Sequence, residues 1–506
     1  MSSRKRTFFL GALLMSAVNL SMRTVSLYFS AFVLSRIGEG GVGLYTLLMN
    51  VFSFAITFVS AGIGLAVTTS IASEVEEQAP DRHRKIVRAA LLYSGSLSLM
   101  ASVLLLCFSN TLALTVIGDG RVGLPLVILA LSLPSMAFST VFSGYFVAVR
   151  RVFVSASVQV MTQLLKIALT VIFLPEGIAI STEEAISRLC IASTLAETLG
   201  ACVLFVFYLC FVSKTKTGMK TPFSPMKPLL KITLPLAMSQ YIRQALLTLE
   251  HSLIPKRLLK FGESTMESVL KDYGALHGMA LPLLLYPLSP LSSFSSLLVP
   301  EFAELKSTDD RGKMGSIASR ALAYTLSYAS VVCVFLLVFA EELSCLIYGS
   351  ASACAHLAVL APIVPLMYLD HVTDAILKGI GEHVYSMWVN ITDSLLSIAL
   401  LYVLLPRLGI LGYAVVIIVM EGYNFLLSFF RLRGRIRLSF SLYRHLLFPL
   451  LCAIASSFLT GDLFHLNGST TPYFFFFLKA LFFLAMFLFF YHLPTLCRKE
   501  KCRSNP

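Results

Sequence analysis

Charged residues are scarce in this 506-residue sequence. They make up 13% of the chain, while 57% of its residues are hydrophobic and the mean hydropathy is +0.81. A soluble domain carries about a quarter charged residues, so this scarcity excludes an ordinary soluble protein. Apolar runs of about 20 residues recur along the whole chain, and they are continuous rather than alternating. The sequence therefore predicts an all-α polytopic membrane protein.

The sequence also lacks the patterns that are typical of catalysis. It contains no nucleophile elbow, no phosphate-binding glycine loop followed by a lysine, and no His/Cys spacing of a metal site. Its ten cysteines include no C-x-x-C pair. We therefore expect no enzymatic activity, no cofactor and no metal.

Basic residues outnumber acidic ones by 40 to 27, which gives a net charge of +13. Most lysines and arginines lie in alternate loops between the apolar runs, as the positive-inside rule expects. The outer loops are nearly free of positive charge, except around PKRLLK at 255–260. The surplus thus indicates membrane topology and not nucleic-acid binding, with both termini on the cytoplasmic side of the cell membrane.

The apolar runs predict about fourteen transmembrane helices. Their approximate ranges are 8–34, 43–72, 87–110, 124–149, 154–175, 189–212, 230–252, 273–300, 317–340, 356–378, 384–405, 409–430, 442–460 and 472–494.

A weak internal repeat relates the two halves of the chain at a shift of about 230 residues. It predicts two six-helix lobes related by a pseudo-two-fold axis along the membrane normal, since each half holds an even number of helices. We assign residues 1–213 to the N-terminal lobe and 230–432 to the C-terminal lobe. Residues 214–229 form a cytoplasmic linker, and residues 433–506 carry two extra helices and a basic tail.

Ten ionisable residues remain inside the apolar segments. They are Arg23, Lys166, Glu197, Arg243, Glu250, Asp370, Asp374, Asp393, Glu421 and Lys479. A charge at the bilayer centre costs about 2.5–3.5 kcal/mol on insertion scales, so such residues usually face a bundle interior or a wet cavity.

Several of these charges have a simpler explanation. Glu421, Asp370 and Lys479 lie near segment ends, where side chains can snorkel to the membrane surface, and Asp374 can pair with Lys378 one helical turn away.

Arg243 and Glu250 share a helix face and are open to either mutual pairing or ligand contact. Arg23 and Lys166 have no opposite charge nearby in sequence, which favours a role in a cavity.

Prolines are concentrated in the eighth apolar segment, at Pro282, Pro287 and Pro290. Each removes a backbone donor, and broken helices often mark the binding site or hinge of a transporter. Prolines are also commoner in membrane helices in general. Three within nine residues nevertheless favour a functional bend.

Three stretches resemble a known family. They are SRIGEGGVGLYTLLMNVFSFAITFVSAGIGLAVTTSIASE (35–74), YGALHGMALPLLLYPLSPLSSFSSLLVPEFAE (273–304) and ILKGIGEHVYSMWVNITDSLLSIALLYVLLPRLGILGYA (376–414). The resemblance is to the stage V sporulation protein B and polysaccharide-flippase family, which is related to the lipid II flippase and to MATE exporters. It implies two lobes around a central cavity and, in the last two helices, a groove for a lipid tail.

The family's fifth helix typically carries Q-x-x-E-Q-x-x-R, and here the corresponding stretch is QVMTQLLK. Gln159, Gln163 and Lys166 match in kind, while Thr162 replaces the glutamate. The loss of that acid leaves Lys166 without its expected partner. Arg23 falls where relatives place a basic residue in the first helix.

The function expected from these features is an alternating-access flippase that exports a polyprenyl-pyrophosphate-linked saccharide to the outer leaflet. Arg23, Lys166 and Arg243 would bind the substrate. Glu197, Glu250, Asp374 and Asp393 are the candidate counter-charges or coupling residues, with Na⁺ or H⁺ as the coupling cation. The alternatives are a cation-coupled multidrug exporter and a non-transporting scaffold of cell-envelope or spore assembly.

Overall fold

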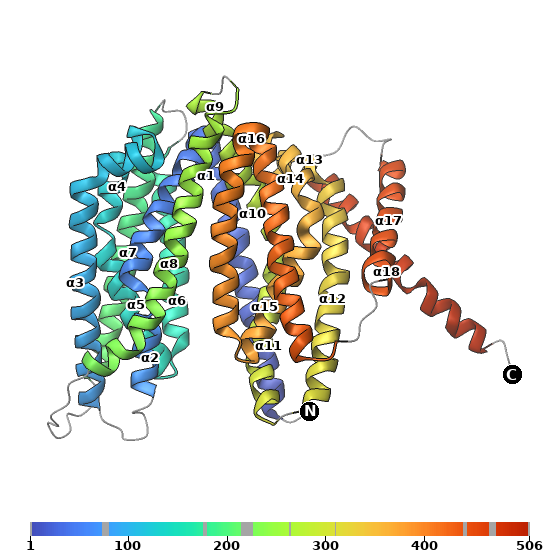
Figure 1. The fold of residues 1–506 in the computed structure, drawn as a ribbon, viewed down its shortest axis with the longest axis horizontal. Helices are drawn as coiled ribbons and strands as arrows, with labels where there is room; N and C mark the ends of the chain where they lie inside the picture. The colour runs from blue at the N-terminus through green and yellow to red at the C-terminus, as the bar shows by residue number, and fades with distance from the viewer. Residues whose placement is uncertain are drawn as a thin grey trace. The chain divides into compact units, whose positions relative to one another are not determined.

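The computed structural model describes residues 3–72, 80–175, 180–213, 226–262, 265–308, 310–438, 443–464 and 472–503. These ranges contain helices and no strand, as the ribbon in Figure 1 shows. The predicted all-helical membrane class is confirmed.

The helices of the first half of the chain are α1 (Ser3–Ser60), α2 (Ile63–Ala72), α3 (Pro80–Leu112), α4 (Gly123–Ala130), α5 (Leu133–Ala148), α6 (Val152–Phe173) and α7 (Thr182–Ser213). They are followed by α8 (Met226–Leu258), α9 (Met266–Tyr273), α10 (Leu281–Leu285), α11 (Leu288–Ser307), α12 (Arg311–Val338), α13 (Ala340–Tyr348), α14 (Ser352–Leu360), α15 (Val364–Gly379), α16 (His383–Arg435), α17 (Phe448–Phe464) and α18 (Pro472–Arg503).

Eight helices in the described residues are long and apolar enough to cross a membrane, and up to ten if each bent pair counts as one span. Two of them, Leu20–Ile71 and His383–Arg435, have 52 and 53 residues. At about 1.5 Å per residue, each is more than twice as long as the roughly 30 Å hydrocarbon core. Gly38 in the first stretch and Gly409 in the second have non-helical backbone angles, and the first stretch also contains the break at Gly62 between α1 and α2.

The chain forms two compact units, which are not the two predicted lobes. Unit 1 comprises Met1–Ser35, Asp272–Leu400 and Arg407–Pro506, and unit 2 comprises Arg36–Lys271 and Leu401–Pro406. The first part of α1 thus belongs to the same unit as α10–α18, and α8 packs with α2 and α3. The lobe boundaries, which follow the sequence repeat and not packing, stay a prediction.

Backbone landmarks recur about 230 residues apart. A left-handed residue ends a helix at Gly118 and again at Gly349, and another stands in the turn at Arg150 and again at Gly381. Two helices are interrupted at matching places: α1 gives way to α2 at Ala61–Gly62, and α10 gives way to α11 at Tyr286–Pro287. The two halves of the chain therefore use the same sequence of turns and breaks.

A close helix crossing also recurs in both units. In unit 2, a Cβ added at Gly144 of α5 would lie 2.7 Å from the carbonyl oxygen of Gly64 in α2. In unit 1, a Cβ added at Gly379 of α15 would lie 2.9 Å from the carbonyl oxygen of Val299 in α11. Because only glycine fits such an approach, these two positions set the distance between the crossing helices.

The two C-terminal helices belong to unit 1. α17 packs on α12, and α18 packs on both α17 and α13. The contact of α17 and α18 with the α12–α13 region is apolar. Its buried residues are Val334, Phe339, Ala453 and Phe483.

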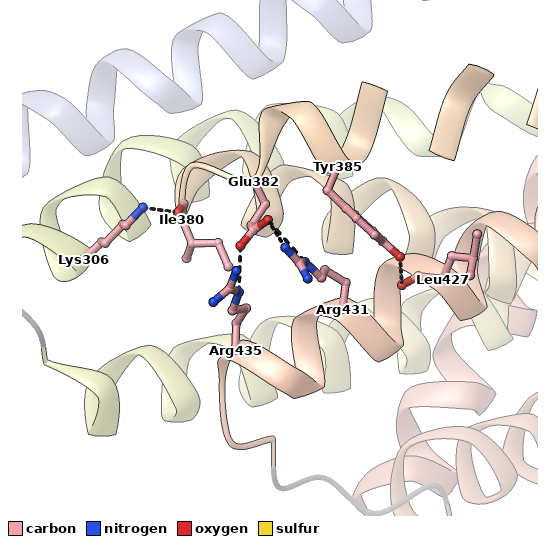
Figure 2. A network of polar contacts seen from close by, with 7 residues as sticks. All are labelled: Lys306, Ile380, Glu382, Tyr385, Leu427, Arg431 and Arg435. Atoms are coloured by element: carbon pink, nitrogen blue, oxygen red, sulfur yellow. Dashed lines mark hydrogen bonds and ion pairs between the residues drawn. The ribbon is translucent and has the colours of Figure 1, made fainter. Parts of the chain in front are cut away.

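A polar network ties the turn between α15 and α16 to the end of α16 (Figure 2). The Glu382 carboxylate accepts hydrogen bonds from Arg431, with Nη2 at 2.8 Å, and pairs with Nε of Arg435 at 2.7 Å. The Arg431 guanidinium also lies 4.9 Å from the Tyr385 ring centre. Lys306 of α11 donates to the carbonyl oxygen of Ile380 in the same turn at 2.6 Å. The network fixes the ends of three helices to one another.

Replacing the carboxylate in E382Q removes both charge-assisted pairs, and we expect the free energy of unfolding to fall by about 1 kcal/mol at pH 7. Hydrogen bonding from Arg431, together with the charges of Arg431 and Arg435, holds the pKa of Glu382 below its usual 4.5. The stabilisation is therefore fully present above pH 4.5 and is lost as the pH falls through the lowered pKa. Thermal unfolding in detergent checks this. A wild-type advantage that stays constant down to about pH 3 would contradict it.

Candidate functional site

Arg23, the deepest charge of the first predicted helix, contacts a backbone carbonyl and not a carboxylate. Its Nη1 donates to the carbonyl oxygen of Leu285 at 2.6 Å. The next residue, Thr24, shares a 2.8 Å hydrogen bond with the hydroxyl of Tyr286. The sequence showed no opposite charge near Arg23 and predicted a substrate-binding role, and the structure provides a backbone partner. Within the described residues no carboxylate lies at ion-pair distance from Arg23.

The carbonyl that Arg23 contacts lies at the break between α10 and α11. The helix axis bends by 59° there. The N–H of Ser289, which would bond the Leu285 carbonyl in an unbroken helix, bonds the Tyr286 carbonyl instead at 3.1 Å. The Tyr286 carbonyl accepts it because Pro290, its partner in an unbroken helix, has no N–H. The break therefore leaves the Leu285 carbonyl without a helical donor, and Arg23 supplies one.

Two tyrosines satisfy the carbonyls on either side of this contact. The Tyr368 hydroxyl of α15 donates to the Leu284 carbonyl at 3.0 Å, and the Tyr328 hydroxyl of α12 donates to the Pro287 carbonyl at 2.7 Å. The two rings stack with their centres 6.2 Å apart. Sequence reasoning identified the prolines of this segment and missed the tyrosines. The prolines imply carbonyls that need donors, but no local signal shows which helix provides them.

Lys166 is not isolated in the membrane, contrary to the expectation from the fifth-helix motif. Its charge acts on Glu197 of α7, the helix that packs against α6, although no direct ion pair joins the two in the described residues. Thr162, which replaces the family's glutamate, stands beside Gly200, one turn beyond Glu197, where an added Cβ would collide with the threonine hydroxyl. The carboxylate near Lys166 thus comes from the next helix and not from its own.

Arg243 and Glu250 both lie on α8, and Arg243 is exposed. Two residues before Arg243, the Tyr241 hydroxyl donates to the carbonyl oxygen of Phe58 at 2.8 Å. Phe58 lies just before the break at Gly62, which has a φ of +73°. In unit 2, as in unit 1, a side chain from another helix therefore satisfies a carbonyl at a helix break.

The acidic residues of α15 and α16 fall into two groups. Asp374 pairs with Lys378 at 2.5 Å, as the sequence predicted, and accepts a hydrogen bond from Ser386. Asp370, Asp393 and Glu421 lie close enough for their charges to repel one another. Snorkelling of Glu421 and Asp370 stays a prediction. The described residues contain no group of three or more His, Cys, Asp or Glu with the geometry of a metal site.

Lys479 of α18 interacts with Glu342 of α13, with 3.6 Å between Nζ and a carboxylate oxygen. It therefore has a protein partner in the same compact unit. The candidate site is left with Arg23 at the helix break, Lys166 near Glu197, Arg243, and the carboxylates of α15 and α16.

The coupling between Lys166 and Glu197 is measurable. We expect K166Q and E197Q each to lower the melting temperature in detergent, because each leaves one charge in the membrane without its counter-charge. The double variant should recover stability, with a coupling free energy of about 1 kcal/mol. The exposed Glu183 at the start of α7 is the control, and K166Q should be additive with E183Q. Additivity of K166Q with E197Q would contradict the pairing.

A family model and a characterised protein are similar to this chain over most of its length. Residues 10–306 match the family model described as polysaccharide biosynthesis protein. Stage V sporulation protein B of Bacillus subtilis (strain 168) is 29% identical over 429 residues, which cover 82% of this chain and 81% of that protein.

Two solved structures share the fold of this chain. The lipid II flippase MurJ in an inward closed conformation aligns with a TM-score of 0.73 at 13% identity, over 95% of this chain and 98% of that one. An inward-facing multidrug resistance MATE family transporter of the MOP superfamily aligns with a TM-score of 0.66 at 18% identity, over 83% and 98%. The chain therefore belongs to the polysaccharide biosynthesis protein family, and it shares its fold with transporters of the MOP superfamily.

Proposed function

We propose that this protein is an alternating-access flippase that exports a polyprenyl-pyrophosphate-linked saccharide to the outer leaflet. The observation that carries the proposal is Arg23. It is a membrane-embedded and exposed guanidinium with a carbonyl partner but, among the described residues, no carboxylate partner. An arginine has five N–H donors in a fork that matches phosphate oxygens. Most of these donors are left for a ligand when one contacts Leu285.

Lys166 and Arg243 are the other proposed substrate-binding cations. The half-buried Lys166 feels the charge of Glu197 without a direct ion pair in the described structure, so its ammonium is available to a stronger anion. A pyrophosphate offers such an anion. An inside-negative potential also favours its outward movement, by about 2.3 kcal/mol per charge per 100 mV.

We also propose the finer topology of fourteen spans, two six-helix lobes and cytoplasmic termini. Breaks at Gly38 and Gly409 support it, because each divides a helix that is long enough for two spans. The turns and breaks that recur about 230 residues apart support the repeat of the lobes. The basic loops support the orientation.

Neutralising the cations tests the proposal. We expect R23Q to reduce flipping at least tenfold and K166Q to reduce it less, since one charge-assisted hydrogen bond contributes about 1.5–3 kcal/mol. Flipping is measured in proteoliposomes as the accessibility of a fluorescent polyprenyl-pyrophosphate disaccharide to an impermeant quencher.

The control is R433Q, which removes an exposed charge near the end of α16 and should flip at the wild-type rate. Full activity of both R23Q and K166Q, at normal expression, would remove the proposed binding role.

A cation-coupled multidrug exporter is the second candidate, and the three neighbouring carboxylates favour it. Asp370, Asp393 and Glu421 repel one another, so a proton or Na⁺ would relieve the repulsion. If this candidate is right, cells that express the protein gain efflux of cationic dyes, and E421Q abolishes the dependence of that efflux on the ion gradient. Efflux equal to that of cells without the protein would reject it.

A further inference from the structure

We propose that the hydrogen bond from Arg23 to the Leu285 carbonyl holds the break between α10 and α11 in place, and that the substrate's pyrophosphate releases this contact, which we call the latch. In this proposal Arg23 is a positioning residue as well as a ligand. Its guanidinium holds the Leu285 carbonyl when no substrate is bound, and it gives up that carbonyl when a phosphate oxygen takes its place. The latch rests on the proposed function, because it requires an anionic substrate in the membrane.

The break needs donors from other helices. Three of its carbonyls, those of Leu284, Leu285 and Pro287, receive them from Tyr368, Arg23 and Tyr328. A carbonyl without a donor in a water-free environment costs several kcal/mol. The bent geometry of α10 and α11 is therefore stable only while these side chains stay in place.

The three donors differ in what else can bind them. Tyr368 is fully buried, and both tyrosines are neutral donors with one O–H each. Arg23 is exposed and carries a full positive charge. Among the three, only Arg23 binds an anion more strongly than it binds a carbonyl, since the attraction between opposite charges adds to the hydrogen bond.

Unit 2 contains an equivalent contact that lacks this property. The Tyr241 hydroxyl of α8 donates to the Phe58 carbonyl beside the break at Gly62, much as Arg23 of α1 donates to the Leu285 carbonyl beside the break at Pro287. Both contacts join a helix to a break that lies in the same compact unit. Because Tyr241 is neutral, an anion does not compete for it, and the break at Gly62 stays held.

Release of the Leu285 carbonyl changes the stability of the break. The carbonyl then needs a new donor, and its partner in an unbroken helix, the N–H of Ser289, now bonds Tyr286 at 3.1 Å. With two carbonyls competing for that one N–H, the hydrogen bonds at the break open more often and the bend changes. Substrate binding at Arg23 is thereby coupled to the shape of the broken helix in unit 1.

Hydrogen–deuterium exchange in nanodiscs tests the latch. We compare phosphatidylcholine nanodiscs with and without polyprenyl pyrophosphate, and a third set that contains phosphatidylglycerol. For wild type, polyprenyl pyrophosphate should raise exchange at residues 286–293 at least threefold and leave residues 58–66 unchanged. R23Q should show the raised exchange at 286–293 without any added lipid, and no further response. Phosphatidylglycerol should have no effect.

Y241F is the matched control, and it should raise exchange only at residues 58–66, equally in all three nanodiscs. Native mass spectrometry of the same samples separates substrate binding, which the flippase proposal requires, from release of the latch. Bound polyprenyl pyrophosphate with unchanged exchange at 286–293 would overturn the latch and leave the flippase proposal standing. Absence of binding would overturn both. An equal response to phosphatidylglycerol would overturn specific recognition of the pyrophosphate. Wild-type exchange at residues 286–293 in R23Q would show that Arg23 does not stabilise the break between α10 and α11.

Discussion

A backbone carbonyl inside a bilayer must find its hydrogen-bond donor within the protein. In this chain that constraint is most demanding at the break between α10 and α11, where Pro287 and Pro290 lack N–H groups. The donors come from Arg23, Tyr328 and Tyr368, which lie on three other helices. The broken helix, the packing of the first part of α1 in unit 1 and the position of a membrane-embedded arginine are consequences of this one requirement.

The same requirement explains how an intramembrane charge can be kept. Placing an arginine in hydrocarbon costs free energy. A donor with a purely structural role does not need a charge, because the neutral Tyr241 satisfies the carbonyl at the break in unit 2. A charged donor at one break and a neutral donor at the equivalent break make the two halves of the chain chemically different. The difference suits a transporter in which one half responds to an anionic substrate and the other half stays fixed.

Much of the fold could be predicted from the sequence, because it depends on composition and local signals. The apolar runs gave the helical membrane class, and the proline cluster at 282–290 gave the place of the break. The pair of Asp374 and Lys378 was predictable because its members are one helical turn apart.

The sequence could not show the contacts that join distant helices. Glu197 lies 31 positions after Lys166, and Tyr328 and Tyr368 lie beyond the break that they support, so no local spacing connects them. The grouping of α8 with α2 and α3 was hidden for the same reason. The internal repeat shows which segments correspond to each other in the two halves, and it does not show which helices pack together. The grouping of Asp370, Asp393 and Glu421 was hidden as well, since the three residues lie on α15 and on both sides of the break at Gly409 in α16.

The central claim is that the Arg23 guanidinium exchanges a carbonyl for a phosphate. A cryo-electron microscopy structure of the protein with polyprenyl pyrophosphate bound in a nanodisc tests it most directly. We expect a phosphate oxygen within about 3 Å of the Arg23 guanidinium, and the Leu285 carbonyl beyond hydrogen-bond distance from it. A bound pyrophosphate that lies away from Arg23, with the contact to Leu285 intact, would contradict the account.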